Sequence, residues 1–166
     1  RGDRLLRYIA LFFILTLWHS NASAYLISKT TGGADIKWFT SSTTYYINSS
    51  GGPSNDIPAM QAAMQAWTAV IPSYFSFVYG GTTTNSAYGT YDSSNIVCYG
   101  PMGLTGTLAE NTFWYDTSSG QLVDSDIKFN TDYAWSTDGS PSAYDIQNVG
   151  THELGHSLSL ADLYNR

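Results

Sequence analysis

Short runs of β-branched and aromatic residues alternate with stretches rich in glycine, serine, threonine and asparagine through most of this chain. Thr43 to Asn48 is such a run, and the polar segment that follows it ends at Pro53. This pattern is typical of β-strands bounded by turns. It predicts five strands, over residues 43–48, 74–79, 96–99, 108–115 and 122–129.

Two other segments carry apolar residues at three- and four-residue spacing, which predicts helices. In the first, Asp56 is the expected N-cap and Pro58 lies in the first turn of a helix that runs to about Val70. The second helix is expected to open at Tyr144 or Asp145. The predicted order is strand, helix, four strands, helix, in one α+β domain without internal repeats.

The first 24 residues have the features of a secretory signal peptide. Three arginines lie within the first seven residues, residues 8–18 are apolar but too short to cross a bilayer, and residues 22–24 form a small-residue cleavage site. An N-terminal membrane anchor is the alternative. We expect a signal peptide at 1–24, a domain at 25–166, and a secreted, extracellular protein without stable membrane insertion after cleavage.

The negative charge argues against a nucleic-acid-binding protein, and the single cysteine excludes a fold held by disulfides within the chain. Without residues 1–24 the chain keeps four basic and twelve acidic residues, a formal net charge of −8. Nucleic-acid binding needs clustered Lys and Arg, so we expect no nucleic-acid partner. Cys98 is the only cysteine, so no disulfide can form within the chain, and we expect it to be a small buried residue on a strand.

The sequence His152-Glu153-Leu154-Gly155-His156 lies on the second predicted helix, with Asp162 six residues further on. Residues four apart lie on one face of a helix, so His152 and His156 can direct a ring nitrogen at one ion. Glu153 is placed beside the first of them, where it can hold a water molecule and accept its proton. This spacing indicates the chemistry of a zinc hydrolase.

The motif and the order of elements resemble the metzincin zinc peptidases, most closely the matrixin-like group. The extended signature of that family, H-E-x-x-H-x-x-G-x-x-H or the same with Asp at the last place, aligns here with residues 152–162. The resemblance implies a twisted mixed five-stranded sheet with two long helices and a zinc cleft at the edge strand. It also implies Zn²⁺ bound by His152, His156 and Asp162.

Two positions differ from the commonest form of this signature. Ser159 stands where the family usually has a glycine with positive φ, a conformation that costs a non-glycine residue roughly 1 kcal/mol. Asp162 stands where a third histidine is commonest, and a carboxylate oxygen is an accepted zinc ligand. The alternative is that Asp162 caps a local turn and that the third ligand lies beyond residue 166.

The resemblance extends upstream to Gly106-Thr107-Leu108-Ala109, which looks like the upper edge strand of the matrixin cleft. It implies that the backbone of Leu108 and Ala109 pairs with an extended peptide substrate. Lys128 stands where many matrixins have a histidine ligand of a second, structural zinc, so we expect one catalytic ion. Calcium at Asp116, Asp124 and Asp126 is an unsupported option, because acids that alternate on a strand commonly form a solvated face.

One family feature has no counterpart in the sequence. Metzincins carry a methionine-containing turn after the third ligand, whereas Met60, Met64 and Met102 all precede the zinc helix. We therefore expect that the closing C-terminal subdomain is missing and that the catalytic domain at 25–166 is incomplete.

The expected function is a secreted zinc endopeptidase that acts on proteins or peptides with a zinc-activated water and Glu153 as general base. Two alternatives stay open. A non-catalytic secreted binding domain derived from such a peptidase would fit the abundant aromatics and the low charge, although it would not need Glu153. A zinc peptidase of the other large class would take a distant glutamate as its third ligand.

Overall fold

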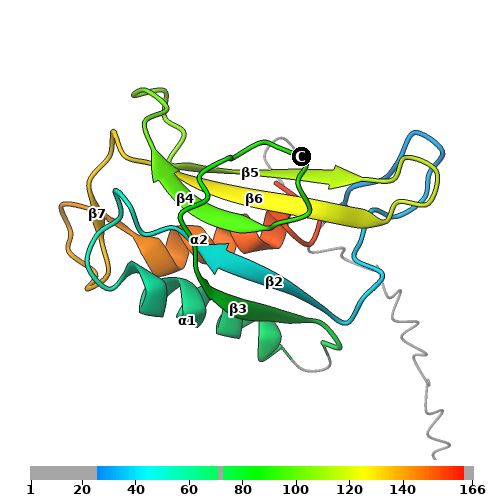
Figure 1. Cartoon of the computed structure of the whole chain (residues 1–166), viewed down its shortest axis with the longest axis horizontal. Coiled ribbons are helices and arrows are strands. Elements are labelled where there is room, and N and C mark those ends of the chain that lie inside the picture. The colour runs from blue at the N-terminus through cyan, green and yellow to red at the C-terminus, as the bar shows by residue number, and fades with distance from the viewer. Residues whose placement is uncertain (1–25, 71–72, 163–166) are drawn as a thin grey trace, which may run out of the picture.

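The computed structural model describes residues 26–70 and 73–162. The predicted strands and helices are all present (Figure 1). They are, with their observed bounds, β2 (Ser42–Ile47), α1 (Asp56–Thr68), β3 (Ser76–Thr82), β4 (Ile96–Gly100), β5 (Ala109–Tyr115), β6 (Leu122–Asn130) and α2 (Ile146–His156). Four two-residue strands complete the described chain: β1 (Leu26–Ile27), β7 (Trp135–Ser136), β8 (Tyr144–Asp145) and β9 (Leu160–Ala161).

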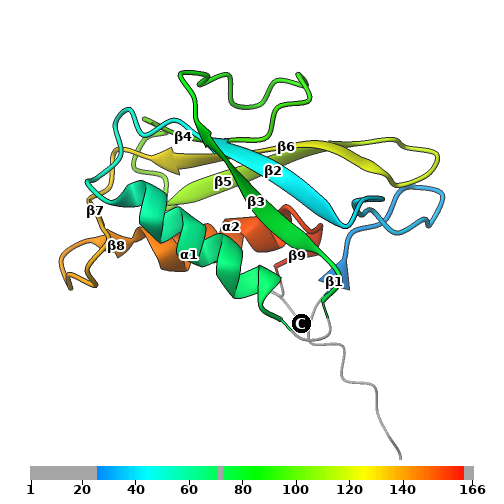
Figure 2. The same cartoon turned by 60° about the horizontal axis from the view of Figure 1, so that its bottom comes forward.

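The main sheet has five strands in the order β3-β2-β4-β6-β5. Neighbours pair in parallel except β5, which runs antiparallel to β6 with Ala109 opposite Phe129 and forms one edge. Both helices lie on the same side of this sheet (Figures 1 and 2). The predicted α+β class, the mixed five-stranded sheet and the two helices are confirmed.

The hydrophobic core fills the space between the sheet and the two helices. Tyr45, Phe129, Met60 and Leu154 are completely buried in it, from two strands and both helices. Gly150 lies where α2 crosses α1, and a Cβ built there would be 2.5 Å from Sδ of Met60. The absence of a side chain at this residue therefore lets the two helices approach closely.

The sequence predicted the N-terminus of one helix correctly and misplaced the N-cap of the other. Helix α2 opens after Asp145, one of the two predicted positions, and the Asp145 carboxylate accepts a capping hydrogen bond from the Asn148 N–H at 2.8 Å. The prediction that Asp56 caps α1 was wrong. The N-cap is Asn55, in a left-handed conformation with φ of 65°, and Asp56 is the buried first residue of the helix. Asparagine tolerates that conformation better than most residues, which shifts the helix start by one position.

The prediction that Asp124 and Asp126 lie on a solvated face of their strand was also wrong. Their exposed fractions are 0% and 1%. The Asp124 carboxylate accepts backbone N–H bonds from Asp92 and Ser93, and that of Asp126 accepts them from Gly89 and Ile96. Through these bonds the two acids fasten the loop between β3 and β4 to β6. The Oδ1 atom of Asp124 is buried without a hydrogen-bond partner among the described residues.

No helix among residues 26–70 and 73–162 is long and apolar enough to cross a bilayer. The predicted signal peptide at 1–24 lies outside the described residues.

Candidate metal centre and cleft

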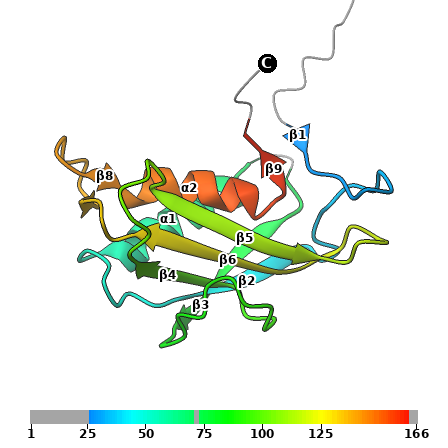
Figure 3. The same ribbon diagram turned by 90° about the horizontal axis from the view of Figure 1, so that it is seen from above.

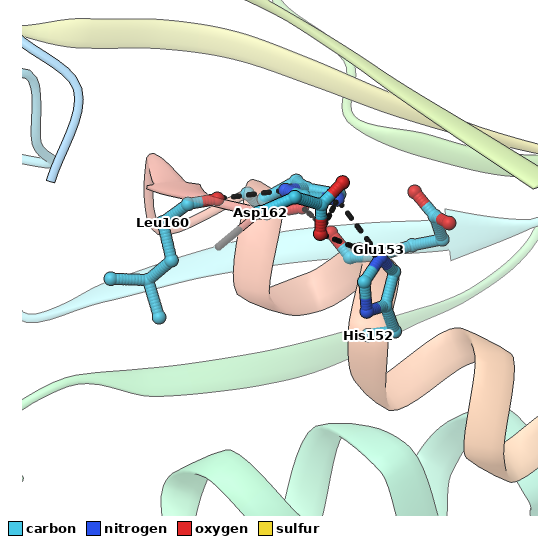
Figure 4. Close-up of polar contacts among 6 residues, drawn as sticks. His152, Glu153, Leu160 and Asp162 are labelled. Atoms are coloured by element: carbon cyan, nitrogen blue, oxygen red, sulfur yellow. Dashed lines mark hydrogen bonds and ion pairs between the residues drawn. The ribbon is translucent and has the colours of Figure 1, made fainter. Parts of the chain in front are cut away.

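Helix α2 and the residues after it bring three potential metal ligands together (Figure 4). The Nε2 atoms of His152 and His156 are 3.1 Å apart, because the two rings leave the same face of α2 one turn apart. The Asp162 Oδ1 atom is 3.4 Å from Nε2 of His152 and 3.7 Å from Nε2 of His156. All three donor atoms therefore face one common point.

These separations suit a tetrahedral zinc ion. Ligands at about 2.0–2.1 Å from zinc in tetrahedral geometry lie about 3.3 Å from one another, close to the three distances between the donor atoms. Imidazole nitrogen and carboxylate oxygen are both common zinc ligands. Three protein ligands leave a fourth position, as in catalytic zinc sites.

A hydrogen bond fixes the orientation of the second histidine. Nδ1 of His156 lies 2.7 Å from the carbonyl oxygen of Leu160, in the short strand β9 (Figure 4). A carbonyl only accepts, so Nδ1 carries the proton and Nε2 presents its lone pair to the site. Such a contact behind a ligating ring commonly sets its tautomer and direction.

The turn from α2 to Asp162 passes through Ser159 with φ of 61°. This is the left-handed conformation that the usual glycine of the signature would adopt without strain. Ser159 is completely buried, and its hydroxyl donates a hydrogen bond to the carbonyl of Ile36. That bond offsets part of the cost of a side chain in this conformation.

A buried polar network attaches the end of α2 to the sheet. The Ser157 hydroxyl lies 2.7 Å from the Tyr45 hydroxyl on β2 and accepts a hydrogen bond from the Asn111 side chain on β5 at 2.8 Å. Trp67 of α1 donates from its indole to the carbonyl of Thr151 at 2.7 Å. Helix α2 is thus hydrogen-bonded to the sheet and to α1 next to the residues that carry the ligands.

Glu153 lies on α2 beside the ligand cluster (Figure 4). Only 5% of its surface is exposed. Burial raises the pKa of its carboxyl to about 7, and the nearby His156 opposes part of that rise. A carboxylate with a pKa near neutrality can both accept and return a proton at physiological pH.

A cleft of about 560 Å³ lies between the edge strand and α2. Residues 106–109 line it from the strand side, and Asn148, Val149, His152 and Glu153 line it from the helix, together with Asp162. The carbonyl of Leu108 accepts the N–H of Asn130 at 2.9 Å, so its backbone faces β6. Successive residues of a strand direct their backbone groups to opposite sides, which leaves those of Ala109 facing the open edge.

Lys128 makes local contacts on the sheet instead of facing the cluster. Its ammonium donates to the carbonyl of Pro101 at 3.2 Å and lies 5.9 Å from the centre of the Tyr88 ring.

Asp116, a possible calcium ligand by its sequence, accepts hydrogen bonds from Ser118 and Ser119 in the turn before β6, and these bonds lower its pKa to about 2. Its carboxylate thus stabilises a turn.

Several groups near the site were not among the residues that the sequence predicted for it. The carbonyl of Leu160 acts through its backbone, which no side-chain pattern reports. Strand β1 is two residues long, too short for periodicity to detect. Asn148 and Val149 precede the first histidine by four and three positions, so the helical period alone could have placed them beside it.

Comparison with known proteins agrees with this geometry. A family model described as matrixin matches residues 37–164. Matrilysin of Rattus norvegicus is 32% identical to the chain over 133 residues, which cover 75% of this chain and 45% of the relative. The chain therefore spans less than half the length of the curated relative that it matches.

Proposed function

This chain belongs to the matrixin family of metallopeptidases, and on that premise we propose that it is a secreted, zinc-dependent endopeptidase. The observation that carries the proposal is the convergence of His152, His156 and Asp162 at distances that fit one zinc ion, beside the buried Glu153. A domain that only binds a partner has no use for a buried general base next to these ligands.

In the proposed mechanism, His152, His156 and Asp162 hold the ion and Glu153 moves the proton. Zinc, when bound, supplies Lewis acidity to a water molecule and to the scissile carbonyl. Glu153 accepts the proton of that water as it attacks and then gives it to the leaving amine. Burial raises the pKa of Glu153 in the metal-free site, and the positive charge of a bound ion would favour the carboxylate form that accepts the proton.

The substrate in this proposal is an extended polypeptide. The free edge of β5 offers the backbone N–H and C=O of Ala109, with which a peptide can pair as an added strand. Leu108 lines the same cleft without offering its carbonyl, which already pairs with Asn130. A peptide along this edge passes His152 and Asp162 of the ligand cluster, because these two residues line the same cleft as Ala109.

Replacement of Glu153 by alanine tests the assignment of the base. We expect kcat/KM for a quenched peptide library to fall at least about 100-fold, since general acid–base catalysis contributes that much or more. The zinc content per chain, measured by atomic absorption, should stay equal to that of wild type. The control is Asp138→Ala, which removes an exposed carboxylate from the loop before α2 and should leave both quantities unchanged.

Two results would contradict this assignment. Substantial cleavage by Glu153→Ala would remove Glu153 from the mechanism. A folded, zinc-loaded wild type that cleaves no peptide in the library would instead favour a binding domain.

A further inference from the structure

The turn that leaves α2 is bound on several sides by the N-terminal part of the domain. We call residues 157–161 the exit turn and residues 26–38 the N-terminal segment. The Trp38 indole donates to the carbonyl of Ser157 at 2.8 Å, and Ser28 donates its N–H to the carbonyl of Ser159 at 2.9 Å. Strand β1 then pairs antiparallel with β9, with Ile27 opposite Leu160, and Figure 3 shows the two side by side.

Ser159 is the residue at which these contacts converge. It accepts the N–H of Ser28 through its carbonyl and donates its hydroxyl to the carbonyl of Ile36. Ser28 and Ile36 are themselves joined, since Ile36 donates its N–H to the carbonyl of Ser28 at 2.9 Å. The three residues form a closed set of hydrogen bonds around a completely buried side chain.

The exit turn carries groups that orient two of the three ligands. The carbonyl of Leu160 accepts from Nδ1 of His156, and Asp162 directly follows Ala161 of β9. A shift of β9 by a fraction of an ångström would move both the acceptor of His156 and the carboxylate of Asp162. The partner that holds β9 in place is β1.

We propose that the N-terminal segment is a positioning element of the zinc site, coupled to the ligands through Ser159. This inference rests on the proposed zinc site and adds that residues more than 100 positions away from the ligands in sequence determine how well the site binds zinc. Ser159 stands where the family usually has glycine, and its hydroxyl forms the hydrogen bond that joins the exit turn to the N-terminal segment.

The test measures zinc affinity by competition with a chromogenic chelator. Ser159→Ala and Ser159→Gly both remove the hydroxyl, whereas Gly also relieves the left-handed backbone. If the hydroxyl positions the turn, both variants should bind zinc about 10-fold more weakly, the lower range for residues that support metal ligands. The control is Ser142→Ala on the exposed loop before α2, which should bind zinc like wild type.

Ser28→Pro tests the same coupling from the other partner. It removes the N–H that Ser28 donates to Ser159 and leaves α2 and the exit turn unchanged in sequence. We expect a similar loss of zinc affinity, with tryptophan fluorescence and circular dichroism of the zinc-free protein like those of wild type. In the double variant Ser28→Pro with Ser159→Ala, the loss of zinc affinity should be smaller than the product of the two single losses. The reason is that both substitutions break the same connection between the N-terminal segment and the exit turn.

The possible results separate this inference from the proposed function. If wild type binds zinc and both Ser159→Gly and Ser28→Pro bind it within about twofold of wild type, the N-terminal segment has no positioning role. Losses that multiply independently in the double variant would also overturn the coupling. Wild type that binds no zinc would overturn the proposed zinc site itself, and the inference with it.

Discussion

Two acidic residues of this protein are buried away from water, and one serine has a backbone conformation that usually requires glycine. Glu153 and Asp126 are acids with exposed fractions of 5% and 1%, and Ser159 has a left-handed backbone. In each case a neighbouring group limits the cost. Backbone N–H groups serve Asp126, the carbonyl of Ile36 serves Ser159, and His156 lies near Glu153.

Asp126 makes stability depend on pH in a predictable direction. Burial raises its pKa to about 6, and Asp124 adds to the rise, whereas the unfolded chain has the ordinary value of about 4. Between these values the folded state binds more protons than the unfolded state, so the free energy of unfolding falls as pH rises through this window. Relative to Asp126→Asn, wild type should gain about 1–2 kcal/mol between about pH 7.5 and pH 4.5.

Urea unfolding of both proteins at each pH measures this difference, and the variant serves as the control for all other titrating groups. A difference between the two proteins that does not change with pH would show that Asp126 is not the buried acid described here. A difference with the opposite slope would show that its hydrogen bonds outweigh its burial.

At the scale of elements, the crossing of α1 and α2 determines where the histidines lie relative to the sheet. Gly150 is closely surrounded at this crossing, because a Cβ added to it would contact Met60 and Ala63 of α1. A Cβ added to Gly155, three residues after His152, would lie 3.1 Å from a carbon of the Trp67 ring. Both glycines of α2 are thus contact points with α1.

Gly150→Ala should destabilise the protein although alanine is the better helix former. The added methyl would meet Met60, and overpacking costs about 1–3 kcal/mol, more than the roughly 1 kcal/mol gained in helix propensity. Urea unfolding measures the change. In a Met60→Ala background, which makes room for the methyl, the same substitution should become neutral or stabilising; an unchanged cost there would contradict the close contact.

The sequence predicted the strands and helices whose apolar residues repeat at a regular spacing, and it did not predict the short strands that lack such a repeat. Alternation and helical spacing located the five main strands and both helices to within a few residues. Strands β1, β7, β8 and β9 have two residues each, so only tertiary pairing defines them. The burial of Asp124 and Asp126 was not predicted, because it depends on a loop that covers their strand.

In the whole molecule, three separate parts of the chain meet at the candidate site. The ligands come from α2 and the residue after β9, the cleft edge comes from β5, and the N-terminal segment holds the exit turn. The spacing His152-Glu153-His156 could be read from the sequence because one helix carries all three residues. The contribution of residues 26–38 could not, because nothing in a one-dimensional pattern places them beside residue 159.

A zinc titration of peptide cleavage tests most directly whether this chain is a zinc peptidase. Wild type freed of metal with a chelator and returned to chelator-free buffer should cleave no peptide of a quenched library. Cleavage should then increase with added zinc and level off at about one ion per chain, as expected for one site with three protein ligands. Full cleavage in the continued presence of chelator, or none by the folded zinc-loaded protein, would contradict the proposal that this chain is a zinc peptidase.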